Sequence, residues 1–115
     1  MKRFFMVFIS SFILFSVSVL AGTQTGTVSQ IIVRQSDGLH YFYISGPSSE
    51  KPGCASKSYW MIKDESSAAG KDQYALLMMA YSMRAKVRVD GLSTCTRWLD
   101  GEDVNTILLL PPSSS

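Results

Sequence analysis

Alternation of apolar and polar residues predicts a β-hairpin near the start of the chain. Residues 39–45 (LHYFYIS) alternate strictly, which places Phe42 and Ile44 on one face of a strand and Tyr41 on the other. Residues 27–35 (TVSQIIVRQ) are rich in β-branched side chains, which favour strands. A Ser-Asp-Gly turn separates the two runs, and this order is typical of two antiparallel strands joined by a short connection.

A helical period replaces the alternation in residues 71–85 (KDQYALLMMAYSMRA). Apolar and aromatic side chains recur there at the i, i+3, i+4, i+7 spacing of one helix face: Tyr74, Leu77, Met78 and Tyr81. A second apolar stripe overlaps the first: Leu76, Met79, Ala80 and Met83. We therefore predict a helix buried on nearly all sides, by its own domain on one side and by a neighbouring subunit on the other.

Three further runs are predicted to be strands: 57–63, 86–89 and 104–110. The segments between the elements are polar or rich in Gly, Pro and Ser, and are expected to be loops: 46–56, 64–70 and 97–103. Three strands, a helix and two strands is the chain order of a mainly β, five-stranded OB-like barrel with one helix between strands three and four. Because order alone does not fix strand pairing, a generic small α+β domain is the alternative.

Composition changes the interpretation of the N-terminus. The chain is 46% hydrophobic and only 17% charged, against about 25% charged in typical domains. Lys2 and Arg3 precede the uncharged residues 4–20, and the small residue Ala21 follows. This is the pattern of an export signal, so we predict that residues 1–21 are a signal peptide. A transmembrane anchor is the alternative, but the apolar run is at the short limit of a span and contains four serines.

The predicted mature domain, residues 22–115, is electrically balanced. Removal of Lys2 and Arg3 reduces the 11 basic residues to nine, which equals the nine acidic ones. Nucleic-acid binding needs a basic face, so this balance argues against a nucleic-acid partner. The length suits a single domain, with a frayed tail at residues 112–115. We expect the protein in the periplasm or secreted, with no membrane attachment after signal cleavage.

Two cysteines, Cys54 and Cys95, lie in the predicted exported part, 41 residues apart. An even number of cysteines in an oxidising compartment predicts a disulfide. A redox or metal-binding pair is the alternative. The sequence has no C-x-x-C motif and only one histidine, His40, which favours the structural bridge.

Established catalytic motifs are missing from the sequence. It contains no G-x-S-x-G, H-E-x-x-H or phosphate-binding loop, and His40 lies in a predicted strand, where packing is its simplest role. Residues 100–103 (DGED) could hold Ca²⁺, but that ion needs roughly six or more oxygens in a defined loop. A solvated acidic turn is therefore expected. We predict no enzymatic activity, no cofactor and no metal site.

Aromatic residues are the one group with clear binding potential. Tyr41, Tyr43 and Tyr59 could present ring faces to a sugar, although strand aromatics more commonly pack a barrel. Trp98 lies in a polar loop (TRWLDG), where an exposed indole suggests a ligand or partner.

Four segments, in the same order, resemble the binding-subunit family of subtilase cytotoxin and typhoid toxin. They are residues 91–96 (GLSTCT), 41–44 (YFYI), 54–56 (CAS) with Trp60 shortly after, and 73–89, where the family's helix runs into a V-R-I/V strand. The resemblance implies an OB fold and a secreted, toxin-like lineage. It also implies a homopentamer with an enzymatic toxin subunit as partner, and recognition of a sialoglycan.

The chain departs from this family at several positions. Tyr43 replaces a family cysteine and that cysteine's partner has no counterpart, so Cys54 and Cys95 would be the retained pair. An insert that precedes the GLSTC segment in the family is missing, and Asp90-Gly91 replaces the aromatic wall of the sialoglycan pocket. Thr25 matches the pocket's hydroxyl residue. The family's sugar pocket therefore does not carry over intact.

Two functions remain open at this point. The first is a secreted, non-enzymatic binding protein that recognises a host glycan or a glycoprotein surface as a ring of identical subunits. The second is a monomeric periplasmic OB-fold protein with a small-ligand or envelope role and no lectin activity. For the first, Thr25, Arg88 and Trp98 are the candidate ligand-binding residues: a hydroxyl, a cation for a carboxylate and an aromatic platform. Arg88 lies between Val87 and Val89, so it is expected to face away from the core.

Overall fold

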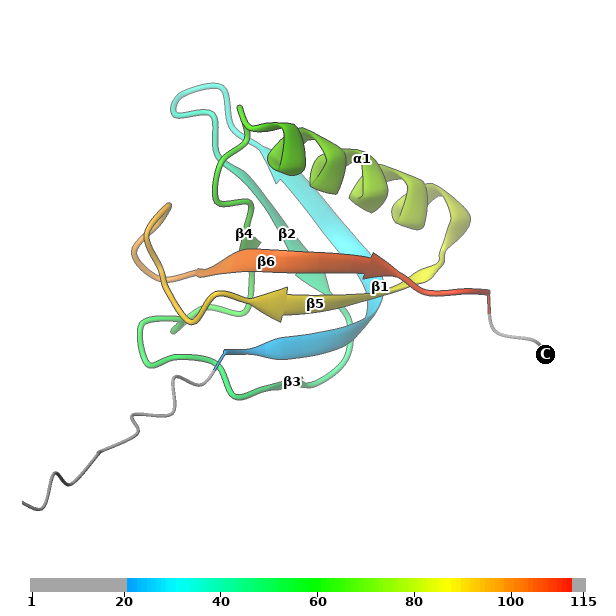
Figure 1. Cartoon of the computed structure of the whole chain (residues 1–115), viewed down its shortest axis with the longest axis horizontal. Helices are drawn as coiled ribbons and strands as arrows, with labels where there is room; N and C mark the ends of the chain where they lie inside the picture. The colour runs from blue at the N-terminus through cyan, green and yellow to red at the C-terminus, as the bar shows by residue number, and fades with distance from the viewer. Residues whose placement is uncertain (1–20, 113–115) are drawn as a thin grey trace, which may run out of the picture.

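The computed structural model describes residues 21–112, which form six strands and one helix (Figure 1). The predicted signal peptide, apart from Ala21, and residues 113–115 of the predicted tail lie outside the described residues. In chain order the elements are β1 (Thr23–Val33), β2 (His40–Ile44), β3 (Ser48–Ser49), β4 (Trp60–Met61), α1 (Ala68–Met83), β5 (Lys86–Gly91) and β6 (Glu102–Leu109). The prediction of a mainly β fold with one helix is confirmed.

Five of the strands close into a barrel. The hydrogen-bonded order is β2-β4-β6-β5-β1, and β1 pairs again with β2 to complete the ring. The pairings are antiparallel except that between β4 and β6, which is parallel. This is the five-stranded, OB-like barrel that the element order predicts, with α1 between β4 and β5.

Strand β1 makes closure possible because it belongs to both halves of the barrel. Residues 23–27 pair with β5, and residues 28–33 pair with β2 in the expected hairpin. A register irregularity separates Val28 from Gln30, where the strand passes from one partner to the other. Irregularities of this kind bend a strand and increase its twist, and they are common at the corners of small barrels.

The barrel interior holds one hydrophobic core. Its members are fully or almost fully buried: Val28, Phe42, Ile44, Trp60, Ile62, Leu77, Ala80, Val87, Val89, Val104 and Ile107. Gln24 also points inward, and its Oε1 accepts a hydrogen bond of 2.8 Å from the Trp60 indole. The Gln24 amide in turn donates to the carbonyl of Ile44 at 2.9 Å. These bonds satisfy the polar ends of the Gln24 and Trp60 side chains.

Helix α1 lies across the barrel against β1 and β6 (Figure 1). It begins three residues before the predicted start, because Ser67 caps it and accepts a hydrogen bond of 3.0 Å from the backbone of Gly70. It ends at Met83, and Arg84 follows in the left-handed conformation. The sequence has a serine at the capping position, but the polar residues around it led to the prediction of a loop over residues 64–70.

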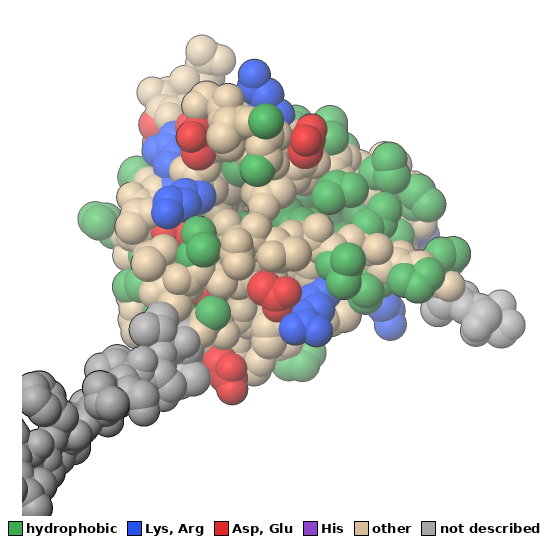
Figure 2. Space-filling view, viewed as in Figure 1, with side chains coloured by type: hydrophobic (Ala, Val, Ile, Leu, Met, Phe, Trp, Pro, Cys, Tyr) green, Lys and Arg blue, Asp and Glu red, His purple; other side chains and the backbone are tan. Residues whose placement is uncertain are grey.

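The barrel covers one side of α1, as expected, and the expected cover of the other side by a neighbouring subunit stays a prediction. Only Gly70, Leu77 and Ala80 are buried, because the barrel presents one contact surface to the helix. Four large apolar residues are exposed by 44–61% of their surface: Met78, Met79, Tyr81 and Met83. Figure 2 shows hydrophobic side chains gathered over the C-terminal ends of α1 and β6. We call these four exposed side chains the outer face of α1.

The remaining differences from the sequence prediction concern strand ends. The loop expected at residues 46–56 contains β3, which pairs with the first residues of β1. The strand expected at 57–63 is hydrogen-bonded as a strand only at Trp60–Met61. Strand β6 begins at Glu102, inside the expected polar loop, and the two acidic side chains at its start are buried.

Candidate ligand-binding site

The segment between β5 and β6, residues 92–101, is here called the Trp98 loop. A disulfide between Cys95 and Cys54 ties it to the connection between β3 and β4, with a Cα–Cα distance of 6.1 Å. The disulfide predicted from the cysteine count is therefore confirmed. It is the first of three constraints on this loop.

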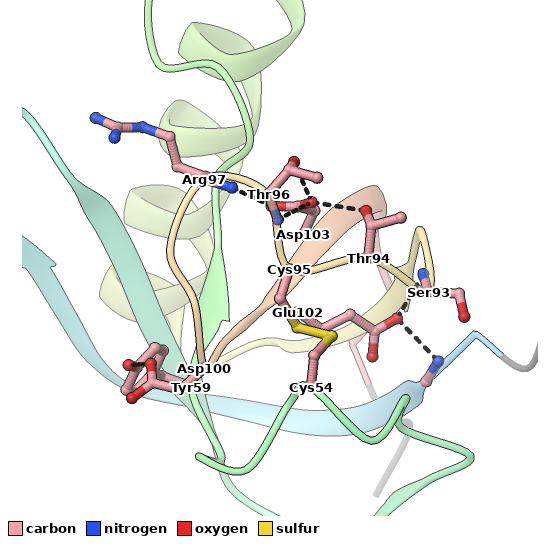
Figure 3. The surroundings of a disulfide bond; sticks show 11 residues. Cys54, Tyr59, Ser93, Thr94, Cys95, Thr96, Arg97, Asp100, Glu102 and Asp103 are labelled. Carbon is pink, nitrogen blue, oxygen red and sulfur yellow. Dashed lines mark hydrogen bonds between the residues drawn. A yellow bond between two sulfur atoms is a disulfide. The ribbon is translucent and has the colours of Figure 1, made fainter.

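Asp103, at the start of β6, is the second constraint. One carboxylate oxygen accepts hydrogen bonds from the hydroxyls of Thr94 and Thr96 (2.7 and 2.6 Å) and from the backbone of Thr96 (2.9 Å). The other accepts from the backbone of Arg97 at 3.1 Å. Figure 3 shows the Asp103 side chain pointing into the curve of the loop. Burial opposes the charged form, but these bonds outweigh it and hold the pKa of Asp103 below its usual range.

Arg97 is the third constraint. Its guanidinium forms a two-pronged ion pair with Glu65, with N···O distances of 3.0 and 2.5 Å, and donates to the backbone carbonyl of Asp37 at 2.9 Å. The hydrogen bonds from Arg97 lower the pKa of Glu65. Arg97 thus connects the loop to the segment before α1 and to the β1–β2 turn. Fixed in these three ways, the loop presents Trp98 in one place.

The expectation of a solvated acidic turn at residues 100–103 is wrong. Glu102 and Asp103 are completely buried, and Asp100 accepts a hydrogen bond from the hydroxyl of Tyr59. Each carboxylate organises neighbouring backbone or side chains, which the run of acids in the sequence does not reveal. Among residues 21–112 no three or more potential ligands (His, Cys, Asp, Glu) come together as a metal site.

Trp98 covers a small cavity on the outer side of β2 and β4. The cavity has a volume of about 40 Å³ and is lined by Arg34, Leu39, Tyr41, Tyr59, Met61 and Trp98. Leu39 and Met61 are buried beneath it but lie outside the main core cluster. The guanidinium carbon of Arg34 lies 5.0 Å from the centre of the Trp98 ring, within the range of a cation–π contact. The Trp98 side chain keeps 39% of its surface exposed.

Three tyrosines extend this surface along the strands. Tyr41 and Tyr43 alternate with the buried Phe42, so they face outward from the barrel. Their rings lie 5.2 and 5.9 Å from that of Tyr59, which stands between them and the Trp98 loop. We define the aromatic surface as these three tyrosines with Trp98 and Arg34.

The other two candidate residues lie elsewhere. Thr25 and Arg88 face each other across β1 and β5, and both are exposed, so the expected outward orientation of Arg88 is confirmed. The guanidinium of Arg88 forms an ion pair with the carboxylate of Asp90 at 3.1 Å. The same carboxylate accepts a hydrogen bond of 3.0 Å from the hydroxyl of Thr23. Within the described part of the chain, Trp98 lies beside Arg34 and the cavity residues and not beside Thr25 or Arg88. The structure therefore brings Thr25 and Arg88 together but does not add Trp98 to them.

Sequence reasoning missed Arg34 as a member of the site. It ends the predicted first strand, next to the turn, and nothing in the local sequence indicates that it will lie over Trp98, 64 positions further on. The hairpin register and the folded loop bring the two together. His40, by contrast, packs as expected, with its ring edge-on to Tyr74 at 5.1 Å and Nδ1 2.8 Å from the carbonyl of Gly38.

Comparisons with known proteins do not assign a family or a function to this site. Within residues 21–112 no helix combines the length and apolar character that a membrane crossing requires. The chain matches no protein-family model, no curated protein and no solved structure.

Proposed function

We propose that this chain is an exported, non-enzymatic binding protein of the toxin-binding-subunit type, and that it recognises a glycan through the aromatic surface. The observation that carries the proposal is the grouping of Trp98, Tyr41, Tyr43 and Tyr59 on one outer face beside a cation. Aromatic rings offer flat apolar faces together with polar edges, which suits the C–H faces and hydroxyls of a sugar ring. Ligand sites commonly combine such apolar walls with a few polar groups.

Rigidity supports a binding role for this surface. The disulfide, the Asp103 hydrogen bonds and the Arg97–Glu65 ion pair all fix the Trp98 loop. A preorganised loop loses little conformational entropy when it binds, so more of the contact energy appears as affinity. The core of the barrel does not require Trp98 to be held this way, because Trp98 lies outside it.

The charges favour neutral over sialylated glycans. A guanidinium fork is a good partner for a sialic acid carboxylate. Arg34, which belongs to the aromatic surface, and Arg97, in the same loop as Trp98, are already paired with Asp37 and Glu65, and the candidate Arg88 is paired with Asp90. A sialic acid carboxylate at these arginines would have to compete with their partners. We therefore expect weak or absent binding of sialoglycans.

A glycan array with purified protein tests this function. Trp98→Ala should reduce binding of the best neutral glycan by about tenfold or more, because a stacked ring contributes on the order of 1 kcal/mol beyond its buried area. Leu99→Ala is the matched control, since Leu99 is 86% exposed in the same loop. Circular dichroism should show that both variants remain folded. Equal loss in the two variants, or tight sialoglycan binding that survives Trp98→Ala, would contradict the proposed site.

Self-association through the outer face of α1 completes the proposal. Four large apolar side chains on one short helix are an unusual exposure for a monomer, and a ring of identical subunits would cover them. An enzymatic toxin subunit would be the partner of such a ring. The alternative, a monomeric periplasmic protein without lectin activity, would leave this face in water.

Mass measurement in solution separates these two states. We expect a mass of about five times that of the mature chain for a closed ring. Met83→Lys should weaken association without unfolding the protein, because Met83 is 61% exposed. Gln35→Lys, which adds the same charge in an exposed turn, is the control. A monomer at tens of micromolar would remove the ring from the proposal and favour the monomeric alternative.

A further inference from the structure

Glu102 is a fully buried carboxylate with one oxygen unused. It is the first residue of β6, and its side chain is completely inaccessible. Oε2 accepts hydrogen bonds of 3.0 Å from the backbone nitrogens of Gly22 and Ser93. Oε1 has no hydrogen-bond partner in the described part of the chain. Figure 3 shows Glu102 turned toward Ser93. A buried carboxylate in this state is costly unless a donor or a positive charge reaches it.

Two glycines form the walls of this carboxylate pocket. A Cβ at Gly22 would lie 2.3 Å from Oε1, and a Cβ at Gly91 would lie 1.7 Å from Oε2. Any side chain at either position would therefore collide with the carboxylate. The backbone of Gly91 also donates to the carbonyl of Gly22 at 2.9 Å, which fixes Gly22 beside Glu102. The pocket is thus built around the backbone of Gly22.

Lys51 lies beside this pocket but forms no ion pair with Glu102. Lys51 lies with its ammonium 4.5 Å from the centre of the Trp60 ring and donates to the carbonyl of Ser58 at 3.2 Å. Burial lowers the pKa of Lys51, and the charge of Glu102 only partly opposes this. Within residues 21–112 no ion pair to Glu102 is formed. The pocket therefore lacks a positive charge at the point where Gly22 meets the carboxylate.

We propose that Glu102 binds the chain's own α-ammonium group, which export processing creates at Gly22. This inference depends on the export part of the proposed function and not on glycan binding. Hydrolysis of the Ala21–Gly22 peptide bond consumes one water, leaves a carboxylate on Ala21 and an amine on Gly22, and the amine takes up a proton at neutral pH. The reaction belongs to a peptidase of the export pathway.

The chemical change at Gly22 matches what the pocket lacks. The peptide nitrogen supplies one N–H and no charge, and this bond goes to Oε2 at 3.0 Å. The α-ammonium supplies three N–H groups and a full positive charge from the same position. One of the added donors can serve Oε1, which lies against Gly22. Maturation therefore converts a one-donor contact into a buried ion pair and fastens the start of β1 to β6.

A two-by-two comparison of stability tests the pairing. Protein that begins at Gly22 is compared with protein that begins two residues earlier, which moves the α-amine about 7 Å along the chain. Each is prepared with Glu102 and with Glu102→Gln. We expect the extension to increase the unfolding equilibrium constant about tenfold or more with Glu102 present, and much less with Glu102→Gln. Glu50→Gln, an exposed carboxylate change, should leave the effect of the extension unaltered.

Amine labelling gives a second readout that does not need Glu102→Gln to fold. A free α-amine normally reacts with acylating reagents before lysine, because its pKa of about 8 is lower than that of lysine. The amine of Gly22 should instead react about tenfold more slowly than the α-amine of the extended protein, and should recover its reactivity in denaturant. Intact mass fixes the start of the exported chain. A start other than Gly22, equal labelling rates, or an extension effect that is the same with Glu102→Gln would overturn the proposal.

Failure of this inference is distinguishable from failure of the glycan function. The first is measured by mass, labelling and unfolding, and the second by glycan binding of the Trp98→Ala variant. A protein that binds no glycan can still protect the amine of Gly22.

Discussion

Leu77→Asp is expected to leave the protein largely unfolded at neutral pH. Leu77 is completely buried between α1 and the barrel core, so the substitution removes apolar contacts and places an unpaired charge where water cannot reach it. The combined effect is several kcal/mol, a large part of the roughly 5–15 kcal/mol that stabilises a typical domain. Circular dichroism with urea titration measures it.

Ala75→Asp is the matched control for this substitution. It introduces the same residue into the same helix at an exposed position outside the outer face of α1, so the helix propensity and charge of the new residue are equal in the two variants. The control should unfold with a midpoint close to that of the unmodified protein. Similar midpoints for both variants would show that the packing of α1 against the core is not as described.

Removal of the disulfide is expected to produce the second largest loss. The bridge between Cys54 and Cys95 closes a loop of 41 residues, and the chain-entropy model gives about 4 kcal/mol for a loop of this length. Cys54→Ser combined with Cys95→Ser should lower the free energy of unfolding by that order. Urea denaturation measures the change. The urea midpoint of the double variant should equal that of the unmodified protein measured under reducing conditions.

Intact mass without reductant checks the state of the bridge directly. The native protein should be two hydrogen masses lighter than its reduced form, and alkylating reagents should not modify either cysteine. Two thiols that react freely in the native protein would contradict the disulfide. The double variant should still retain part of the Trp98 loop, because the hydrogen bonds to Asp103 and the Arg97–Glu65 ion pair do not depend on it.

Sequence alone was sufficient for features set by neighbouring residues. The alternation in residues 39–45 and the turn at Asp37-Gly38 predicted the hairpin, because side chains alternate between the faces of a strand. The spacing of apolar residues predicted α1 for a similar reason. The disulfide followed from the number of cysteines, because a pair in an oxidising compartment has few other uses. The hairpin and the helix depend on residues that are close in sequence, and the disulfide depends on there being only two cysteines to pair.

The tertiary structure alone decided the placement of the charged and exposed groups. The run Asp100-Gly101-Glu102-Asp103 suggests a solvated turn, yet Glu102 and Asp103 are buried and accept hydrogen bonds from the backbone, Glu102 from Gly22 80 positions away and Asp103 from Arg97 in the adjoining loop. Arg34 meets Trp98 only after the barrel closes and the loop folds over it. The two apolar stripes of α1 look equivalent in sequence, but the barrel offers one surface, which buries Leu77 from the first stripe and Ala80 from the second and leaves the outer members of both exposed. Burial is a property of the assembled surface, so no local pattern of residues can specify which face, carboxylate or ring will remain in contact with water.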